Sequence, residues 1–320
     1  MRRGATTLRA IRAYIPPMQS ERFGEYLSLG AAMAWSSGLI LFKLSSEELS
    51  ALSLNIFKNL IAITLFAITV AVQPAALESL AQTSVRDLAV LALSGVLGIA
   101  IADTLFFFAM SRLGVGLAAI VDCVYSPAVV FFGWILLGES LRAHEYVGGA
   151  MILSAVLVAT GQAPSVSLSR RDLLIGAGAA ILGVSLMAYG IVLATPILRT
   201  GDITVAAFVR LFAGTVFLIL AALIAGRGND LVRAITPSRI WRFGIPAATI
   251  GTYVCLMCWI GGFKYAKSGV AALLNQTSVI FSLLLAAIFL REKLTGRKIA
   301  AVAMAISGVL VMQLWPQVSG

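Results

Sequence analysis

The chain has 320 residues, of which 60% are hydrophobic and 12% charged, and its mean hydropathy is +0.97. A single water-soluble core cannot bury that much apolar surface, so the composition excludes an ordinary soluble domain and predicts a protein of the lipid bilayer. The formal net charge of +10 is therefore expected to meet anionic lipid, and nucleic acid is not an expected partner.

Few groups in the sequence carry covalent or metal chemistry. There is no G-x-x-x-x-G-K phosphate loop, and the single histidine, His144, has no ligand cluster around it. Cys123 lies in an apolar run, as do Cys255 and Cys258, whose C-x-x-C spacing we interpret as helix packing. We expect no metal, no cofactor and no enzymatic activity.

The first 25 residues form a separate basic segment. Its basic residues, Arg2, Arg3, Arg9, Arg12 and Arg22, outnumber its acidic residues, Glu21 and Glu25. Pro16-Pro17 prevents one continuous helix from joining this segment to the membrane. We interpret residues 1–25 as a basic cytoplasmic arm. An organellar transit peptide, and a start assigned upstream of Met18, are the alternatives.

Apolar runs of about 17 to 24 residues follow, each long enough for a helix to cross about 30 Å of hydrocarbon. Ten such helices are predicted, at about 26–43, 51–72, 87–110, 115–137, 145–161, 173–194, 203–225, 242–264, 269–290 and 298–315. Residues 162–172, rich in Ser, Pro and Arg, are predicted to be a linker, and residues 316–320 a short tail.

The chain repeats itself at an offset of 153 positions. Residues 108–158 match residues 261–311 without a gap, with about thirteen identities in roughly fifty positions. Each unit holds five predicted helices, an odd number, so the second unit must enter the membrane in the opposite orientation. The predicted architecture is an all-α polytopic membrane protein, in which residues 26–161 and 173–315 form two inverted five-helix repeats.

The Lys and Arg residues in the connections between predicted helices favour opposite membrane orientations in the two halves. Lys and Arg of the first half favour a cytoplasmic amino terminus, and those of the second half favour the reverse. Because the first helix usually dominates, we expect both termini in the cytoplasm and the chain in a bacterial inner membrane.

The repeated unit is similar to a known family. An apolar helix with a central proline, Pro127, is followed by LLGESL at 136–141 and a Gly-rich closing helix; the second copy has Ile280 in place of the proline. Trp35 followed by Ser36-Ser37, and Arg210 in AFVRLFAGTV, also fit this pattern, which resembles the EamA-type unit of the drug/metabolite transporter superfamily. The resemblance implies a ten-helix exporter or exchanger of small organic solutes, driven by ion or substrate gradients.

Four ionisable side chains lie deep inside predicted spans. Each costs at least about 2.5–3.5 kcal/mol to insert, so Lys58, Asp103, Asp122 and Arg210 are candidates for function. Helical rise places the first three at one depth, about 10–11 Å below the surface opposite the amino terminus. A structural Lys58–Asp103 ion pair is one interpretation, and a substrate cavity with Asp122 at its centre is the other.

The repeat favours the second interpretation for Asp122. Its counterpart at the 153 offset is Asn275, followed by Gln276, so both copies place a polar group at the same point of the fourth helix. Burial favours the neutral form of a carboxyl group, so Asp122 is a candidate to bind and release a coupling proton. Hydrogen bonding between helices is the alternative for Asn275 and Gln276.

Aromatic side chains inside the spans are candidates to line an amphipathic pocket, with core or lipid packing as the alternative. They are Trp35, Tyr125, Tyr189, Tyr253 and Trp259.

The resulting expectation is a secondary active transporter that exports a small amphipathic or zwitterionic metabolite, such as an amino acid or a drug-like compound. One alternative is an antiporter of sugar phosphates or other organic anions, with Lys58, Arg210 and Lys264 as anion ligands. A membrane-embedded enzyme, a channel and a scaffold without transport activity are less favoured.

Overall fold

The computed structural model describes residues 17–45, 50–160, 169–236, 241–289 and 295–318, and all of its regular secondary structure is helical. The first half consists of α2 (Pro17–Ser45), α3 (Ala51–Val72), α4 (Pro74–Gln82), α5 (Val85–Gly95), the π-helix η1 (Val96–Ile101), α6 (Ala102–Asp122), α7 (Tyr125–Leu137) and α8 (Ala143–Thr160). The second consists of α9 (Arg170–Thr200), α10 (Ile203–Ile224), α11 (Gly228–Ile235), α12 (Trp241–Ala248), the π-helix η2 (Thr249–Val254), α13 (Cys255–Tyr265), α14 (Ser268–Asn275), α15 (Ser278–Phe289) and α16 (Gly296–Val318).

Many of these helices are long and apolar enough to cross a membrane. Six segments qualify by length and composition: Leu52–Val72, Val85–Phe106, Arg170–Thr200, Ile203–Ile224, Trp241–Tyr265 and Ser268–Phe289. Tyr125–Leu137, Ala143–Val158 and Ile299–Met312 are shorter apolar helices. The prediction of an all-helical polytopic membrane protein is therefore confirmed.

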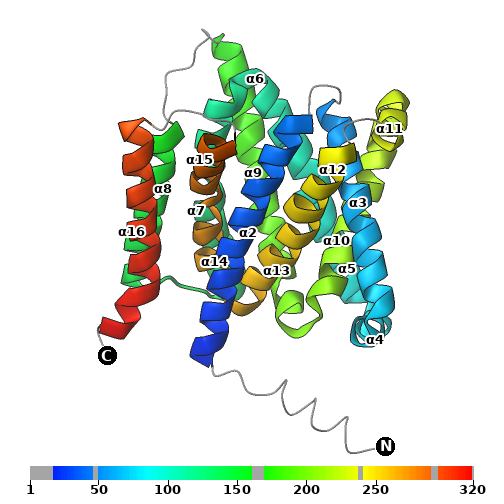
Figure 1. The fold of residues 1–320 in the computed structure, drawn as a ribbon. Helices are drawn as coiled ribbons and strands as arrows, with labels where there is room; N and C mark the ends of the chain where they lie inside the picture. The colour runs from blue at the N-terminus through cyan, green and yellow to red at the C-terminus, as the bar shows by residue number, and fades with distance from the viewer. Residues whose placement is uncertain (1–16, 46–49, 161–168, 237–240, 290–294, 319–320) are drawn as a thin grey trace, which may run out of the picture.

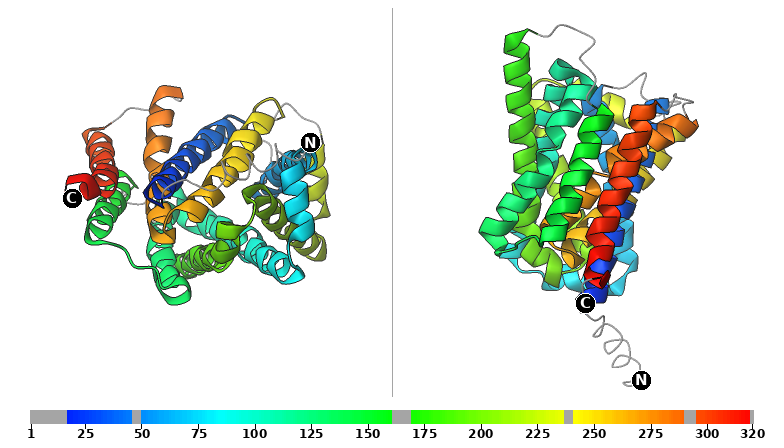
Figure 2. Two further views of the ribbon diagram at one scale, coloured as in Figure 1. Left: turned by 90° about the horizontal axis from the view of Figure 1, so that it is seen from below. Right: turned by 90° about the vertical axis from the view of Figure 1, so that its left-hand side faces the viewer.

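The two halves run in opposite directions through the bundle. In Figure 1, α2 rises from the lower end, whereas α9 descends from the upper end. The start of α2 and the end of α16 both lie at the lower end, which both side views show (Figures 1 and 2). Both ends of the described chain therefore lie on one side of the bundle.

The halves are interlaced, because the first helix of each packs against the third helix of the other. A Cβ atom added to Gly251 of η2 would lie 2.7 Å from the Cα of Gly38 in α2. On the other side, a Cβ added to Gly190 of α9 would lie 3.0 Å from the carbonyl oxygen of Ser94 in α5. Only glycine lets these backbones come so close.

Departures from α-helical geometry occur at the same offset as the sequence repeat. The π-helices Val96–Ile101 and Thr249–Val254 are 153 residues apart at both their bounds (249 − 96 and 254 − 101). The ends of α6 and α14, Asp122 and Asn275, are also 153 apart, as are the starts of α7 and α15. The repeat is therefore a repeat of backbone irregularities as well as of side chains.

Several predicted boundaries differ from the structure. The first helix, expected from residue 26, begins at Pro17, so residues 17–25 of the expected basic arm are its first turns. The connection expected at 111–114 is helical, and the chain breaks after Asp122 instead, at Cys123 and Val124. Pro127 has no N–H group to bond the carbonyl of Cys123 four residues earlier, which accounts for a break there. The second copy breaks at the same place with Ile280 in the proline position, so proline is not required.

The predicted linker 162–172 also ends earlier than expected, because α9 begins at Arg170. Ser169 caps this helix by accepting a hydrogen bond from the backbone N–H of Asp172 at 3.0 Å. Residues 161–168 lie outside the described part of the chain.

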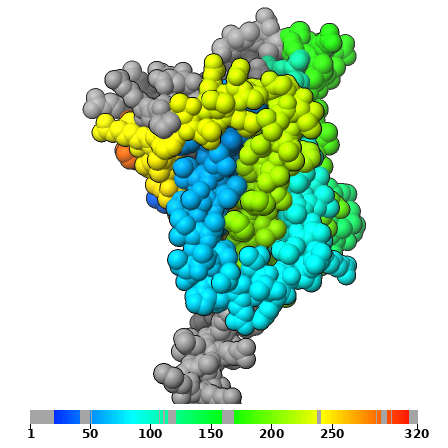
Figure 3. Space-filling model, turned by 90° about the vertical axis from the view of Figure 1, so that its right-hand side faces the viewer, coloured from blue at the N-terminus to red at the C-terminus, as the bar shows by residue number. Residues whose placement is uncertain are grey.

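The fifth helices of the two halves, α8 and α16, form a pair at one side of the bundle (Figure 2). Their backbones meet at Gly148 and Gly308, where a Cβ on either residue would lie within 2.6–2.7 Å of the other's carbonyl oxygen. On the opposite side of the molecule, α3, α10 and α5 lie side by side and α11 crosses the upper edge (Figure 3).

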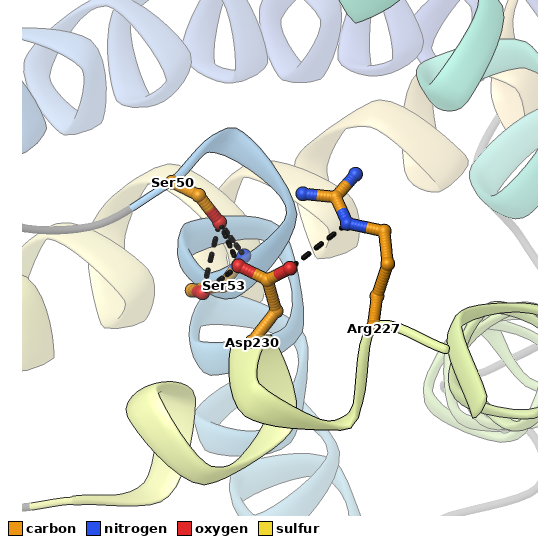
Figure 4. Close-up of polar contacts among 4 residues, drawn as sticks. All are labelled: Ser50, Ser53, Arg227 and Asp230. Carbon is orange, nitrogen blue, oxygen red and sulfur yellow. Dashed lines mark hydrogen bonds and ion pairs between the residues drawn. The ribbon is translucent and has the colours of Figure 1, made fainter. Parts of the chain in front are cut away.

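A polar contact ties α11 to the start of α3 at the upper end. Asp230 accepts hydrogen bonds from Ser50 Oγ at 2.5 Å, Ser53 Oγ at 3.0 Å and Arg227 Nε at 2.9 Å (Figure 4). The hydrogen bond from Ser50, followed by those from Ser53 and Arg227 and the charge of Arg227, holds the pKa of the Asp230 carboxyl below its usual value of 3.8. The carboxylate form is thus the form that this contact favours.

Candidate functional site

The centre of the bundle is the place where the two helix breaks meet. Gln276, at the break between α14 and α15, donates from Nε2 to the backbone carbonyl of Asp122, 3.1 Å away at the break between α6 and α7. Ser126 of α7 donates to the carbonyl of Ala272 in α14 at 3.1 Å. Side chains of each half thus satisfy backbone carbonyls of the other.

The side chain of Ser36 in α2 also reaches this region. Its Oγ lies 2.6 Å from the carbonyl oxygen of Ser278, the first residue of α15, and 2.8 Å from that of Ala32. The Trp35-Ser36-Ser37 motif of the first helix therefore contacts the break of the second half.

Asp122 and Asn275 end the two helices that stop at these breaks, and both are half-buried. Gln276, by contrast, is 4% exposed and uses its amide on the Asp122 backbone. The structure gives Gln276 the helix-to-helix hydrogen bond that was the alternative for it. Asp122 and Asn275 keep the partly accessible positions.

Arg210 lies in the core of the bundle and is 1% exposed. Its Nη1 donates to Ser94 Oγ of α5, and Ser94 donates in turn to the carbonyl of Gly190 in α9. The guanidinium carbon lies 5.5 Å from the centroid of the Trp259 ring, in cation–π geometry. Three helices of both halves therefore fix the position of this arginine.

The surroundings of Arg210 leave hydrogen-bonding groups without partners. Within the described residues, the buried Arg210 Nε and the Tyr125 hydroxyl have no hydrogen-bond partner. The Tyr125 hydroxyl lies beside the indole of Trp259 without reaching hydrogen-bond geometry, and Arg210 and Asp122 lie in its neighbourhood. The structure thus brings together Arg210, Tyr125 and Trp259, with Asp122 near the same tyrosine.

Lys58 and Asp103 form a second charged locus. Lys58 Nζ donates to Asn59 Oδ1 at 3.2 Å, and the ion pairs within 4.0 Å among the described residues do not include a Lys58–Asp103 pair. Asp103 and Cys255 nevertheless lie in the neighbourhood of Lys58. The two charges therefore share a neighbourhood without forming the direct contact of a structural ion pair.

The three basic residues considered as anion ligands are Lys58, Arg210 and Lys264, and each lies beside or on a different part of α13. Lys58 is near Cys255, Arg210 is at Trp259, and Lys264 donates to the carbonyl of Gly201 at the lower end. From Cys255 to Lys264 is nine residues, or about 13 Å of helix. These cations do not converge on one point.

The remaining aromatic candidates are dispersed. Tyr189 packs edge to face on Phe132 at 5.4 Å, and Trp35 is 38% exposed. Tyr253 packs on Phe66 at 4.6 Å and shares a 2.7 Å hydrogen bond with Thr69. Tyr125 and Trp259 are thus the two aromatic candidates that adjoin a buried charge.

The lower end is closed by contacts between the halves. Glu139, in the connection between α7 and α8, pairs with Arg199 and accepts the backbone N–H of Ser268, the first residue of α14, at 2.8 Å. Lys267 pairs with Glu145 at 3.1 Å. Glu139 therefore caps α14 and pairs with Arg199, whereas Glu292, its counterpart at the 153 offset, lies outside the described residues.

Some residues of this region give little signal in the sequence. Ser94 and Gly190 are common residue types in apolar helices, and their roles appear only when α5, α9 and α10 are packed together. In the part of the chain that the structure describes, no group of three or more His, Cys, Asp or Glu residues suits a metal ion.

Comparison with known proteins identifies the fold and the family. The model of the EamA-like transporter family matches residues 22–161 and 174–314, nearly the whole described chain in two copies. A solved crystal structure superposes with a TM-score of 0.76 over 91% of this chain and 96% of its own, at 18% identity, which shows a shared fold.

Three curated relatives are similar in sequence. An uncharacterized transporter of Archaeoglobus fulgidus is 24% identical over 91% of this chain and 98% of its own length. Protein PecM of Dickeya dadantii is 25% identical over 68% of this chain and 71% of its own. A protein of Streptantibioticus cattleyicolor named "Probable terminal-alkyne amino-acid exporter" is 41% identical over 21% of this chain and 22% of its own.

Proposed function

The chain belongs to the EamA-like transporter family, and we propose that it exports a small amphipathic or zwitterionic metabolite by alternating access. In this proposal the ten predicted segments all span a bacterial inner membrane as two inverted repeats, with both termini in the cytoplasm. Family membership also agrees with the expectation that the chain is a transporter and not an enzyme.

The observation that carries the proposal is the meeting of the two helix breaks. A break leaves backbone carbonyls and helix ends inside the membrane, where only protein or a polar ligand can satisfy them. Half-buried Asp122 and Asn275 stand at these ends, and Arg210 lies near the same centre. Inverted repeats that meet at a midplane site of this kind can rock around it and expose it to each side in turn.

The polar groups at the centre favour a solute with charges of both signs. A carboxylate, Asp122, and a guanidinium, Arg210, both lie in the neighbourhood of Tyr125, which belongs to the apolar core cluster. The printed name of the Streptantibioticus cattleyicolor relative refers to an amino acid, which is a zwitterion, although that match is short.

An organic-anion antiporter is the second candidate, and the absence of an acidic partner for Arg210 among the described ion pairs favours it. The spread of Lys58, Arg210 and Lys264 along α13 argues against a three-cation cradle for a sugar phosphate. A zwitterion needs only one of these cations.

Transport itself is tested in vesicles that contain the purified chain. A pool of labelled amino acids and other metabolites is presented under an imposed gradient, and accumulation of at least one solute above its external concentration is expected. A channel would only equilibrate the solute, and an absence of movement of every solute would refute export by this chain.

The coupling ion is tested at Asp122, which we propose binds and releases a proton as its environment changes. Asp122→Asn should remove the dependence of transport on the pH gradient and leave the protein folded, with Asp103→Asn as the control for loss of a membrane carboxylate. Unchanged coupling in Asp122→Asn would remove this residue from the mechanism.

A further inference from the structure

The strongest unexplained feature of the core is a buried cation that no anion neutralises. Arg210 is 1% exposed, and the ion pairs among the described residues do not include it. Its fixed partners are a hydroxyl, Ser94 Oγ, and an aromatic face, Trp259, and both are neutral. A buried charge without a counter-charge is costly, so such an arrangement is expected where a ligand supplies the missing anion.

Among the described residues, two hydrogen-bonding groups in the neighbourhood of the guanidinium lack partners. A guanidinium has five N–H donors in a planar fork. Ser94 takes one through Nη1, whereas Nε has no partner, and neither does the Tyr125 hydroxyl. Buried donors in membrane cores are rarely left unpaired, so two of them around one cation indicate a missing acceptor.

Gly98 leaves room beside the same group. A Cβ atom at Gly98 would lie 3.7 Å from Arg210 Nη2, at ordinary contact distance, so any side chain longer than alanine would occupy the space next to the guanidinium. Gly98 lies in η1, and π-helical segments are frequent at functional sites.

The core cluster that includes Tyr125 and Trp259 is apolar. Tyr125, Val129, Ile260 and Phe263 belong to the same buried cluster, and Trp259 packs edge to face on Phe263 at 5.1 Å. A ligand held by its anionic end at Arg210 would therefore place an apolar body against these side chains.

From this geometry we infer that Arg210 and Tyr125 form a subsite for the carboxylate of an apolar or aromatic solute, with Trp259 as the wall beside it. The inference rests on the proposed export function and names the class of its substrate. A carboxylate matches the guanidinium fork with two parallel hydrogen bonds and leaves an oxygen lone pair for the tyrosine hydroxyl. A phosphate would present a larger dianion to the same single cation.

The test is ligand-induced thermal stabilisation of the purified full-length chain. The probes are L-phenylalanine, L-leucine, 3-phenylpropionate and 4-methylpentanoate, together with L-phenylalaninamide, L-leucinamide and phenyl phosphate. Carboxylates should raise the unfolding temperature, whereas the amides, which lack the anion, should not. Phenyl phosphate should stabilise the chain less than 3-phenylpropionate does.

Two variants locate the effect. Arg210→Met should abolish the stabilisation by carboxylates, and Arg112→Met, which removes an arginine paired with Asp172, is its control. Tyr125→Phe removes a hydroxyl that has no protein partner, so the free protein should unfold at an unchanged temperature and carboxylate affinity should fall about tenfold. Tyr189→Phe is the matched control on α9.

Any of three results would overturn the subsite: no carboxylate stabilises the chain, amides stabilise it equally, or Tyr125→Phe and Tyr189→Phe bind alike. If Arg210→Met fails to fold, the Tyr125 comparison still decides. Export is judged separately, because a chain that accumulates an amine or a neutral solute in vesicles would remain an exporter without this subsite.

Discussion

The contact between α5 and α10 yields the sharpest prediction, because it places a glycine directly over the backbone of Arg210. A Cβ atom at Gly95 would lie 2.6 Å from the carbonyl carbon of Arg210 and 2.8 Å from its Cα. The Arg210 carbonyl oxygen lies closer still, and ordinary contact begins at 3.4 Å, so the helices must separate by more than 0.8 Å (3.4 − 2.6) to accept an alanine. Backbone atoms cannot turn aside as a flexible side chain can.

The size of the effect follows from two opposing terms. Overpacking of this kind costs typically about 1–3 kcal/mol, and replacing a helical glycine by alanine recovers up to about 1 kcal/mol. Gly95→Ala should therefore lose up to about 2 kcal/mol and lower the unfolding temperature by several degrees. It should also draw Ser94 away from Arg210 and reduce transport.

Gly178→Ala is the matched control. Its added Cβ meets nothing within 4 Å, so only the helix term remains and the unfolding temperature should stay or rise. Thermal unfolding of both purified variants, followed by tryptophan fluorescence in detergent, measures the difference. Shifts of the same sign and size would refute the close approach of α5 and α10 described here.

Two further predictions concern the ends of the bundle. Glu139→Gln should lower the unfolding temperature by the equivalent of about 1 kcal/mol, because an amide lacks the negative charge that attracts Arg199 and stabilises the start of α14. Equal stability of Glu139→Gln and wild type at both low and high salt would contradict this. Asp230→Asn should destabilise by about 1 kcal/mol or less at pH 7, since it removes the carboxylate that accepts from Ser50. Because the folded pKa of Asp230 is lowered from 3.8, its contribution is present above about pH 4 and is lost as the pH falls through the folded value. The difference between the variant and wild type should therefore shrink in melts recorded at successively lower pH below about 4, and a difference that stays constant over that range would contradict the assignment.

The repeat explains how much of this molecule its sequence predicts. Hydrophobic runs predict the helices, and the 153-residue offset relates Asp122 to Asn275, which the structure places at equivalent helix ends. The depth calculated from helical rise predicts that Lys58 and Asp103 lie near each other, but it does not predict the rotamers of their side chains. It therefore cannot tell that Lys58 bonds Asn59 instead.

The rest depends on backbone detail and on packing between the halves. The π-helices and the position of the breaks cannot be read from hydropathy, because a π turn changes hydrogen bonding without changing composition. Residues 111–114, SRLG, resembled a connection because of their polar side chains and glycine, although they continue α6. Ser94 becomes a partner of Arg210 only through the crossing of α5 and α10, which no local pattern encodes.

The three native cysteines lie at or near the elements that form the core site, which helps experiment. Cys123 is buried at the first break, whereas Cys255 and Cys258 lie half-buried on α13, one at the level of Lys58 and the other next to Trp259. None of the three cysteines forms a disulfide. Modification by a small water-soluble thiol reagent, read residue by residue with and without solute, would therefore report which levels water reaches during the transport cycle, with no engineered label.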